Sequence, residues 1–134
     1  MPWDVEYVAD THIVVISGSG RLSSQDAPRL VVQAALLMNE NGATHFLCDY
    51  SDAVGEATTL GIHDLPEFQE KAGTPKSAKI ALVLPRTGHK VEDFLFYETV
   101  CRNRGYDCKA FKSREDAVKW LEQGKASQTE HRLP

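Results

Sequence analysis

The stretch FLCDYSDAVGEATTLGIHDLPEF, residues 46–68, decides the fold class, because it leads from a buried strand through a polar turn into a helix. Residues 44–50 predict the strand, with Phe46, Cys48 and Tyr50 on one of its faces. The capping-box pattern of Asp64 with Glu67 predicts that the main helix begins at residue 64 or 65. A strand followed by a helix is half of the repeating unit of a parallel sheet.

The residues before this stretch predict a hairpin and a long helix. Residues 3–7 alternate apolar and acidic side chains, which is the period of a half-exposed strand. IVVISGSG, residues 13–20, predicts a buried strand that ends in glycines. Only the turn at 9–12 separates these strands, so they must pair antiparallel. Apolar residues at helical spacing then predict a helix over 24–41, which Asn41-Gly42 ends.

The residues after it continue to alternate strands with helices. Residues 77–85 predict a strand buried on both faces, because its apolar run has no polar break. Residues 90–104 predict a helix, and residues 105–111 predict a further strand. Residues 113–124 predict a short last helix, which Ser113 caps and Gly124 ends.

This order of elements predicts an α/β domain. Its sheet is expected to be mainly parallel and five-stranded, a mixed sheet with an N-terminal antiparallel hairpin, accompanied by about four helices. Residues 1–123 are predicted to form a single domain. Residues 124–134 lack apolar periodicity and are predicted to form a flexible C-terminal tail.

Composition places the chain among globular proteins and argues against several kinds of partner. The 134 residues carry 19 acidic and 15 basic side chains, which argues against binding to nucleic acid. No apolar run is long enough for a transmembrane segment, and no signal-peptide pattern opens the sequence, so a cytoplasmic location is expected. The cysteines Cys48, Cys101 and Cys108 lack metal-site spacing and predict buried, inert thiols.

Several motifs resemble the SpoIIAA-like superfamily over most of residues 3–122. They are the helix start SGRLSSQDA (19–27), the strand end LCDYS (47–51) and the C-terminal GYDCKAFKSREDAVKWL (105–121). This superfamily contains the STAS domains of anti-sigma-factor antagonists and is related in fold to CRAL-TRIO lipid-binding domains. The chain is most similar to a bacterial branch of small stand-alone members at DLPEF (64–68), ALVLP (81–85) and DFLFYETVCRNRGYDCKAF (93–111). The resemblance implies the fold more strongly than it implies a function.

The resemblance draws attention to the loop after Asp49. In the anti-sigma-factor antagonists this loop leads to an Asp-Ser-Ser-Gly-Leu stretch, where phosphorylation of a serine at a helix N-terminus breaks binding to a partner kinase. Residues 56–60 keep only the acid, one hydroxyl (Thr58) and the leucine of that pattern. Thr58 is therefore either a phosphorylation switch or an ordinary helix cap. The candidate partner or switch loop comprises Asp49, Ser51, Glu56, Thr58 and Thr59.

The helix predicted at 90–104 carries more apolar side chains than one core-facing stripe can bury. Leu95 is expected to face the sheet. The candidate interface or apolar ligand face comprises Phe94, Phe96, Tyr97 and Val100. Three interpretations stay open, namely that a second protomer covers the surplus, that an apolar ligand does, or that part of it is simply exposed.

Three arginines are candidate contacts for an anion or a phospholipid headgroup. Arg86 follows the strand predicted at 77–85, and open α/β sheets bind ligands at the carboxyl ends of their strands. Arg102 and Arg104 lie at the end of the helix predicted at 90–104. The plainer interpretation of those two is that they complement the helix dipole.

No constellation of residues predicts catalysis, a cofactor or a metal site. Asp49, Ser51 and His63 lack the glycines of a nucleophile elbow, and His63 with its acidic neighbours lacks a further His or Cys ligand. Together with this lack of catalytic residues, the resemblance to the SpoIIAA-like superfamily implies a non-enzymatic regulatory or protein-interaction module of the STAS-like type. The apolar surplus of helix 90–104 predicts that it forms a homodimer, and another regulatory protein is a candidate partner. The alternative is a carrier of a small apolar or lipid-like ligand between the sheet and helix 90–104.

Overall fold

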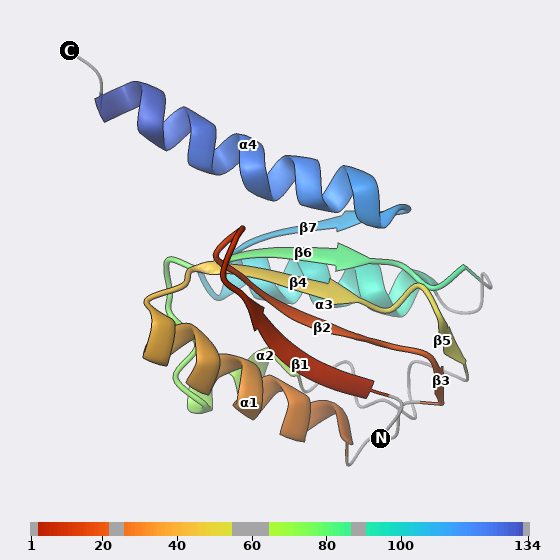
Figure 1. Cartoon of the computed structure of the whole chain (residues 1–134). Coiled ribbons are helices and arrows are strands. Elements are labelled where there is room, and N and C mark those ends of the chain that lie inside the picture. Colours follow the sequence, from red (N-terminus) through yellow and green to blue (C-terminus); the bar gives the residue numbers. More distant parts are fainter. Residues whose placement is uncertain (1–2, 22–25, 55–64, 87–90, 133–134) are drawn as a thin grey trace.

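The computed structural model describes residues 3–21, 26–54, 65–86 and 91–132 (Figure 1). Its elements in chain order are β1 (Trp3–Val8), β2 (Ile13–Gly18), β3 (Gly20–Arg21), α1 (Asp26–Asn41), β4 (His45–Asp49), β5 (Ala53–Val54), α2 (Leu65–Lys71), β6 (Lys79–Val83), α3 (Val91–Asn103), β7 (Asp107–Phe111) and α4 (Arg114–Arg132).

The five longer strands form one sheet in the order β1-β2-β4-β6-β7. β1 pairs antiparallel with β2, and β2, β4, β6 and β7 pair parallel. Over the described residues, this arrangement confirms the predicted α/β fold, with its mainly parallel five-stranded mixed sheet, N-terminal antiparallel hairpin and about four helices. A short parallel pair, β3 with β5, adds to the predicted fold.

Helices cover both faces of the sheet. α1, α2 and α3 lie on one face, and α4 crosses the other face alone (Figure 1). Side chains alternate across each strand, so neighbouring residues of β4 enter different cores. Phe46 and Cys48 join the larger core, to which α1 and α3 also contribute, whereas Leu47 packs in the smaller core with Ala117 and Leu121 of α4.

A histidine closes the β1–β2 hairpin. His12 has a φ of 58°, in the left-handed region that costs a non-glycine residue about 1–3 kcal/mol. Its Nδ1 hydrogen-bonds the Tyr7 hydroxyl, and its Nε2 lies 3.3 Å from the carbonyl oxygen of Gly42, just after α1. These contacts hold the turn in its conformation and tie the hairpin to the end of α1.

The last helix is longer than predicted. α4 begins as expected, because the Ser113 hydroxyl caps it by accepting a hydrogen bond from the Asp116 amide at 3.2 Å. The prediction that Gly124 ends this helix is wrong, since α4 continues to Arg132. A glycine costs a helix interior only about 1 kcal/mol, and most of the residues that follow it are acceptable helix formers. The division into a domain at 1–123 and a flexible tail at 124–134 stays a prediction.

Candidate functional site

The parallel strands end at one edge of the sheet, where open α/β sheets bind their ligands. The turns after β4, β6 and β7 surround a cavity of about 380 Å³ at this edge, which we name the edge cavity. Its polar lining consists of Asp49, Ser51, Asp52, Arg86, Lys112, Ser113 and Arg114. Charged side chains from three separate turns therefore converge on one space.

Asp49 holds two of the turns around the edge cavity together through hydrogen bonds of its carboxylate. Its side chain is buried, and Oδ1 accepts hydrogen bonds from the Ser51 amide at 3.0 Å and from the Ser51 hydroxyl at 2.6 Å. Oδ2 accepts a hydrogen bond from Arg114 Nη1 at 3.1 Å. One carboxylate thus fixes the turn after β4 and joins it to the first residue of α4.

The remaining charges of the edge cavity are loosely held. Arg86 Nη1 lies 3.8 Å from Asp52 Oδ1, and both side chains are mostly exposed, so this pair contributes about 0–1 kcal/mol. Lys112 forms no ion pair with the described residues. Arg86 and Lys112 are therefore available to bind a negatively charged group by ion pairs and hydrogen bonds.

The predicted switch loop coincides with this cavity at its start. Asp49 and Ser51 line the edge cavity. Glu56, Thr58 and Thr59 lie outside the described residues. The two described members of the loop are thus placed beside the cationic groups of Arg86 and Lys112.

The structure does not bring the three predicted arginines together. Arg86 lies at the edge cavity, whereas Arg102 and Arg104 lie at the opposite end of the sheet, just before β7 begins. Arg104 Nη1 binds Glu70 Oε2 at 3.2 Å, and Arg102 Nε donates to the Cys108 carbonyl at 2.7 Å.

Lys112 and Arg114 join Arg86 instead, and sequence reasoning missed both. Their position directly after the strand predicted at 105–111 was the available signal, because parallel strands end at the same edge.

The apolar surplus of α3 is distributed differently from the prediction. Tyr97 is buried in the larger core, Val100 is half-buried, and the Phe94 side chain lies outside the described residues. Phe96 is 48% exposed, and Leu95, which was expected to face the sheet, is 41% exposed. We name Leu95 and Phe96 the α3 patch.

A buried polar cluster lies where α2 and α3 meet the sheet. Gln69 of α2 is fully buried, and its Oε1 accepts hydrogen bonds from the Tyr97 hydroxyl and, at 3.6 Å, from Cys101 Sγ. Sequence reasoning missed Gln69, because a glutamine in a short helix beside acidic residues has the pattern of an exposed position.

The three thiols are buried, as predicted. Burial raises the pKa of the Cys48 thiol, and a hydrogen bond with Cys101 together with burial raises the pKa of the Cys108 thiol. These two thiols are therefore protonated and unreactive near neutral pH.

The described residues offer neither a cluster of metal ligands nor a helix suited to spanning a membrane. Among the described residues, no group of three or more His, Cys, Asp or Glu side chains could hold a metal ion. Over the same residues, no helix combines the length and the apolar character that crossing a bilayer requires.

Sheet order, hairpin and helix placement define a SpoIIAA-like α/β fold. A Thermotoga maritima protein proposed to be an anti-sigma factor antagonist is similar, with 18% identity, a TM-score of 0.54, and coverage of 90% of this chain and 94% of the other. An uncharacterised Shewanella loihica protein of the DUF3478 family, which has a SpoIIAA-like fold, matches with 18% identity, a TM-score of 0.51 and coverage of 89% and 91%. No protein-family model and no curated protein matches this sequence.

Proposed function

We propose that this chain is a non-enzymatic regulatory module that acts by binding other proteins and that self-associates through α3. The observation that carries the proposal is the α3 patch, because Leu95 and Phe96 are 41% and 48% exposed on a helix whose opposite side is core. Large neighbouring apolar side chains at a protein surface mark interaction sites. The fold, shared with a protein proposed to be an anti-sigma factor antagonist, supports a regulatory role.

The edge cavity is the proposed binding surface for a second regulatory protein. The cationic groups of Arg86 and Lys112 suit a carboxylate or phosphate group of that partner, and Asp49 holds the surrounding turns in place. The surface also adjoins the loop that begins at Ser51, so modification of that loop would alter the charge that a partner meets.

The lipid-carrier alternative has less support. The sheet-facing side of α3 is occupied by Tyr97 and Cys101, which are both buried in the larger core. Tyr97 and Cys101 are further tied to Gln69. Packing and hydrogen bonds therefore fill the space that a ligand between the sheet and α3 would need.

Phe96→Glu is expected to convert the homodimer into a monomer, because a carboxylate cannot be buried without a partner in an apolar interface. Sedimentation velocity over a concentration series measures this change. Phe96 is half-exposed in the monomer, so the free energy of unfolding should change by less than about 1 kcal/mol.

The matched control is Val32→Glu, on α1, where the native side chain is 43% exposed. Val32→Glu should leave the dimer intact. A dimer that survives Phe96→Glu, or a wild-type protein that is monomeric at every concentration, contradicts self-association through α3.

Inorganic phosphate is a simple probe for the edge cavity. Titration is expected to shift the backbone amide resonances of Ser51, Arg86 and Ser113 in NMR spectra, because phosphate accepts charge-assisted hydrogen bonds from the nearby cations. The double variant Arg86→Gln with Lys112→Gln should bind phosphate about tenfold more weakly.

Lys119→Gln is the control for this titration, because Lys119 lies on α4 and pairs with Glu115. It should leave phosphate affinity unchanged. Shifts that are spread over the whole surface, or that persist in the double variant, would show that the edge cavity is not an anion site.

A further inference from the structure

The two outer strands of the sheet, β1 and β7, differ in what lies along their outer edges. The outer edge of β7 is covered by side chains of α3. The Glu98 carboxylate accepts a hydrogen bond from the Ala110 amide, and Arg102 Nε donates to the Cys108 carbonyl at 2.7 Å. The backbone amide of Asp107 and the carbonyl of Phe111 form hydrogen bonds on the β6 side of the strand. Because this direction alternates along a strand, the backbone groups of Cys108 and Ala110 point away from β6, toward the outer edge. Two side chains of α3 thus occupy the outward groups to which another strand would bind.

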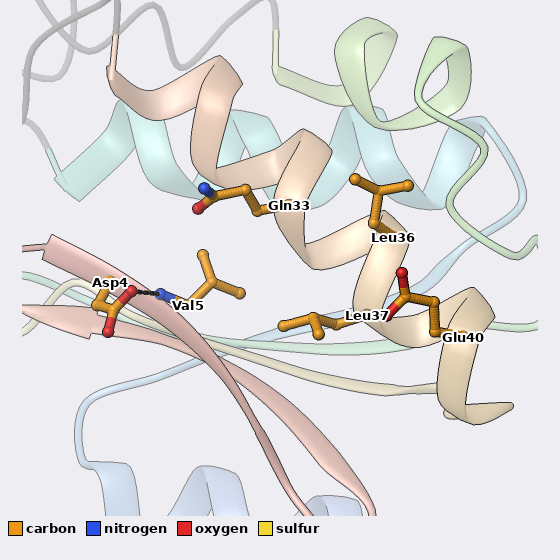
Figure 2. A pocket seen from close by; sticks show the side chains of 6 residues that line it. All are labelled: Asp4, Val5, Gln33, Leu36, Leu37 and Glu40. Carbon is orange, nitrogen blue, oxygen red and sulfur yellow. Dashed lines mark hydrogen bonds between the residues drawn. The ribbon is translucent and has the colours of Figure 1, made fainter.

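The β1 edge is open. β1 pairs with β2 on one side, and no strand among the described residues pairs with its other side. The outward amide of Val5 donates to Asp4 Oδ1 at 2.8 Å, a bond drawn in Figure 2. The carbonyl oxygen of an added strand can replace this carboxylate, which would free Asp4 to bind a cation.

A groove beside this open edge is lined by both apolar and polar side chains. A cavity of about 290 Å³ lies between β1 and α1, lined by Asp4, Val5, Gln33, Leu36, Leu37 and Glu40 (Figure 2). Its apolar members come from both elements, and Leu36 is 56% exposed. The volume is at the lower limit for a small-molecule site, which is about 300–1,000 Å³, and suits aliphatic side chains of a peptide.

The charges around the edge are acidic. Asp4 and Glu6 lie on β1 and are exposed, Glu40 lines the groove, and the whole chain has a formal net charge of -4. A second copy of β1 paired antiparallel would place carboxylates close to carboxylates, which destabilises a strand pair. The charge pattern therefore favours a partner strand with basic side chains over a second copy of this chain.

We infer that β1 binds an extended segment of a partner protein in which basic and apolar residues alternate. The segment adds an antiparallel strand to the outer edge of β1. Its apolar side chains enter the groove beside Val5 and Leu37, and its basic side chains lie near Asp4 and Glu6 on the other face. This site is separate from the α3 patch and the edge cavity, so its failure would leave the proposed function untouched.

The probe is a capped peptide of alternating lysine and valine, six residues long to match β1. In NMR titrations it is expected to shift the amide resonances of residues 3–8 and 33–40. The corresponding glutamate–valine peptide is expected not to bind. Absence of binding by the lysine–valine peptide, or shifts outside these two segments, overturns the inference.

Backbone methylation tests strand addition directly. Val5 points its amide outward and its side chain toward the groove. The residue opposite it in an antiparallel pair exchanges both hydrogen bonds with it and shares its face, so that residue must be a valine of the peptide. N-methylation of the valines should abolish binding, whereas N-methylation of the lysines should preserve it. Equal binding of the two methylated peptides means electrostatic attraction alone and overturns the inference.

Charge reversal tests the acidic rim. Asp4→Lys combined with Glu6→Lys is expected to weaken the lysine–valine peptide about tenfold or more and to permit binding of the glutamate–valine peptide. The control Glu115→Lys reverses an exposed charge on α4 and should change neither affinity. The inference is contradicted if the double variant binds the lysine–valine peptide as tightly as the control does. It is also contradicted if the double variant does not bind the glutamate–valine peptide.

Discussion

Raising the pH from 8 to 11 is expected to unfold the protein. Burial raises the pKa of Tyr50 and Tyr97 well above the ordinary value, as it does for Cys48, and the Cys108 pKa is raised by its hydrogen bond with Cys101 and by burial. In the unfolded chain the thiols ionise near about pH 8.5 and the phenols near about pH 10.

The free energy of unfolding falls with rising pH because the folded and unfolded states bind different numbers of protons. A raised pKa in the folded state means that, above pH 8.5, the folded protein holds protons that the unfolded chain has lost. The stability that these groups contribute is complete below the unfolded pKa values and falls as pH rises. Cys48 and Cys108 together should remove about 3 kcal/mol per pH unit, and this slope should double once the tyrosines ionise in the unfolded chain. The loss therefore steepens above about pH 10, where the thiols and the phenols of the unfolded chain ionise together.

Urea unfolding in steps from pH 7 to pH 11, with a reducing agent present, measures this loss. Cys108→Ala is the matched variant, because it removes one of the two thiol protons and should halve the slope between pH 9 and pH 10. A free energy of unfolding that stays constant up to pH 10 would mean that these groups are accessible to solvent in the folded protein.

Breaking the contact between Gln69 and Tyr97 is expected to destabilise the fold more than removing both partners. Tyr97→Phe leaves Gln69 Oε1 without its hydroxyl donor, and Gln69→Leu leaves the Tyr97 hydroxyl buried without an acceptor. Each single change should cost about 1–3 kcal/mol.

The double variant, Gln69→Leu with Tyr97→Phe, should lie within about 1 kcal/mol of the native protein. Replacement of both partners by apolar groups of similar shape removes the hydroxyl donor together with its amide acceptor, and only the weak 3.6 Å contact of Cys101 Sγ is lost besides. It also removes Gln69 Nε2, which is buried without a hydrogen-bond partner among the described residues. Urea unfolding of the four proteins completes the double-mutant cycle. Tyr7→Phe, whose hydroxyl meets His12 at an exposed site, is the control and should cost less than about 1 kcal/mol. If the loss of stability in the double variant equals the sum of the two single losses, Gln69 and Tyr97 contribute to stability independently, which contradicts this account.

Periodicity was sufficient to predict the sheet, because the strands and helices of this chain differ clearly in apolar spacing. The alternation in residues 3–7 corresponds to the edge strand β1, and the unbroken apolar run at 80–84 corresponds to the inner strand β6. The start of the helix after the polar turn was also predictable, since α2 begins at Leu65.

Periodicity failed where several arrangements satisfy the same pattern. α3 is apolar around most of its circumference, so its sequence could not separate the buried Tyr97 from the exposed Leu95. A glycine after a helical run ends many helices. In this chain α4 continues through Gly124, because the residues beyond it also favour a helix.

The candidate site was predictable only in part. The position of Arg86 after a parallel strand pointed to the correct edge of the sheet. The convergence of Lys112 and Arg114 on the same cavity depends on β7 lying next to β6 and on α4 crossing the opposite face. Neither relation is contained in the local spacing of the sequence.

Native mass spectrometry of freshly purified protein tests the central claim most directly, because one spectrum reports both the number of subunits and any retained ligand. The account predicts a dimer at twice the 14.9 kDa chain mass, with no added mass. A monomer that retains an additional several hundred daltons, on the order of a drug-sized or lipid-like ligand, would contradict it and favour a carrier instead.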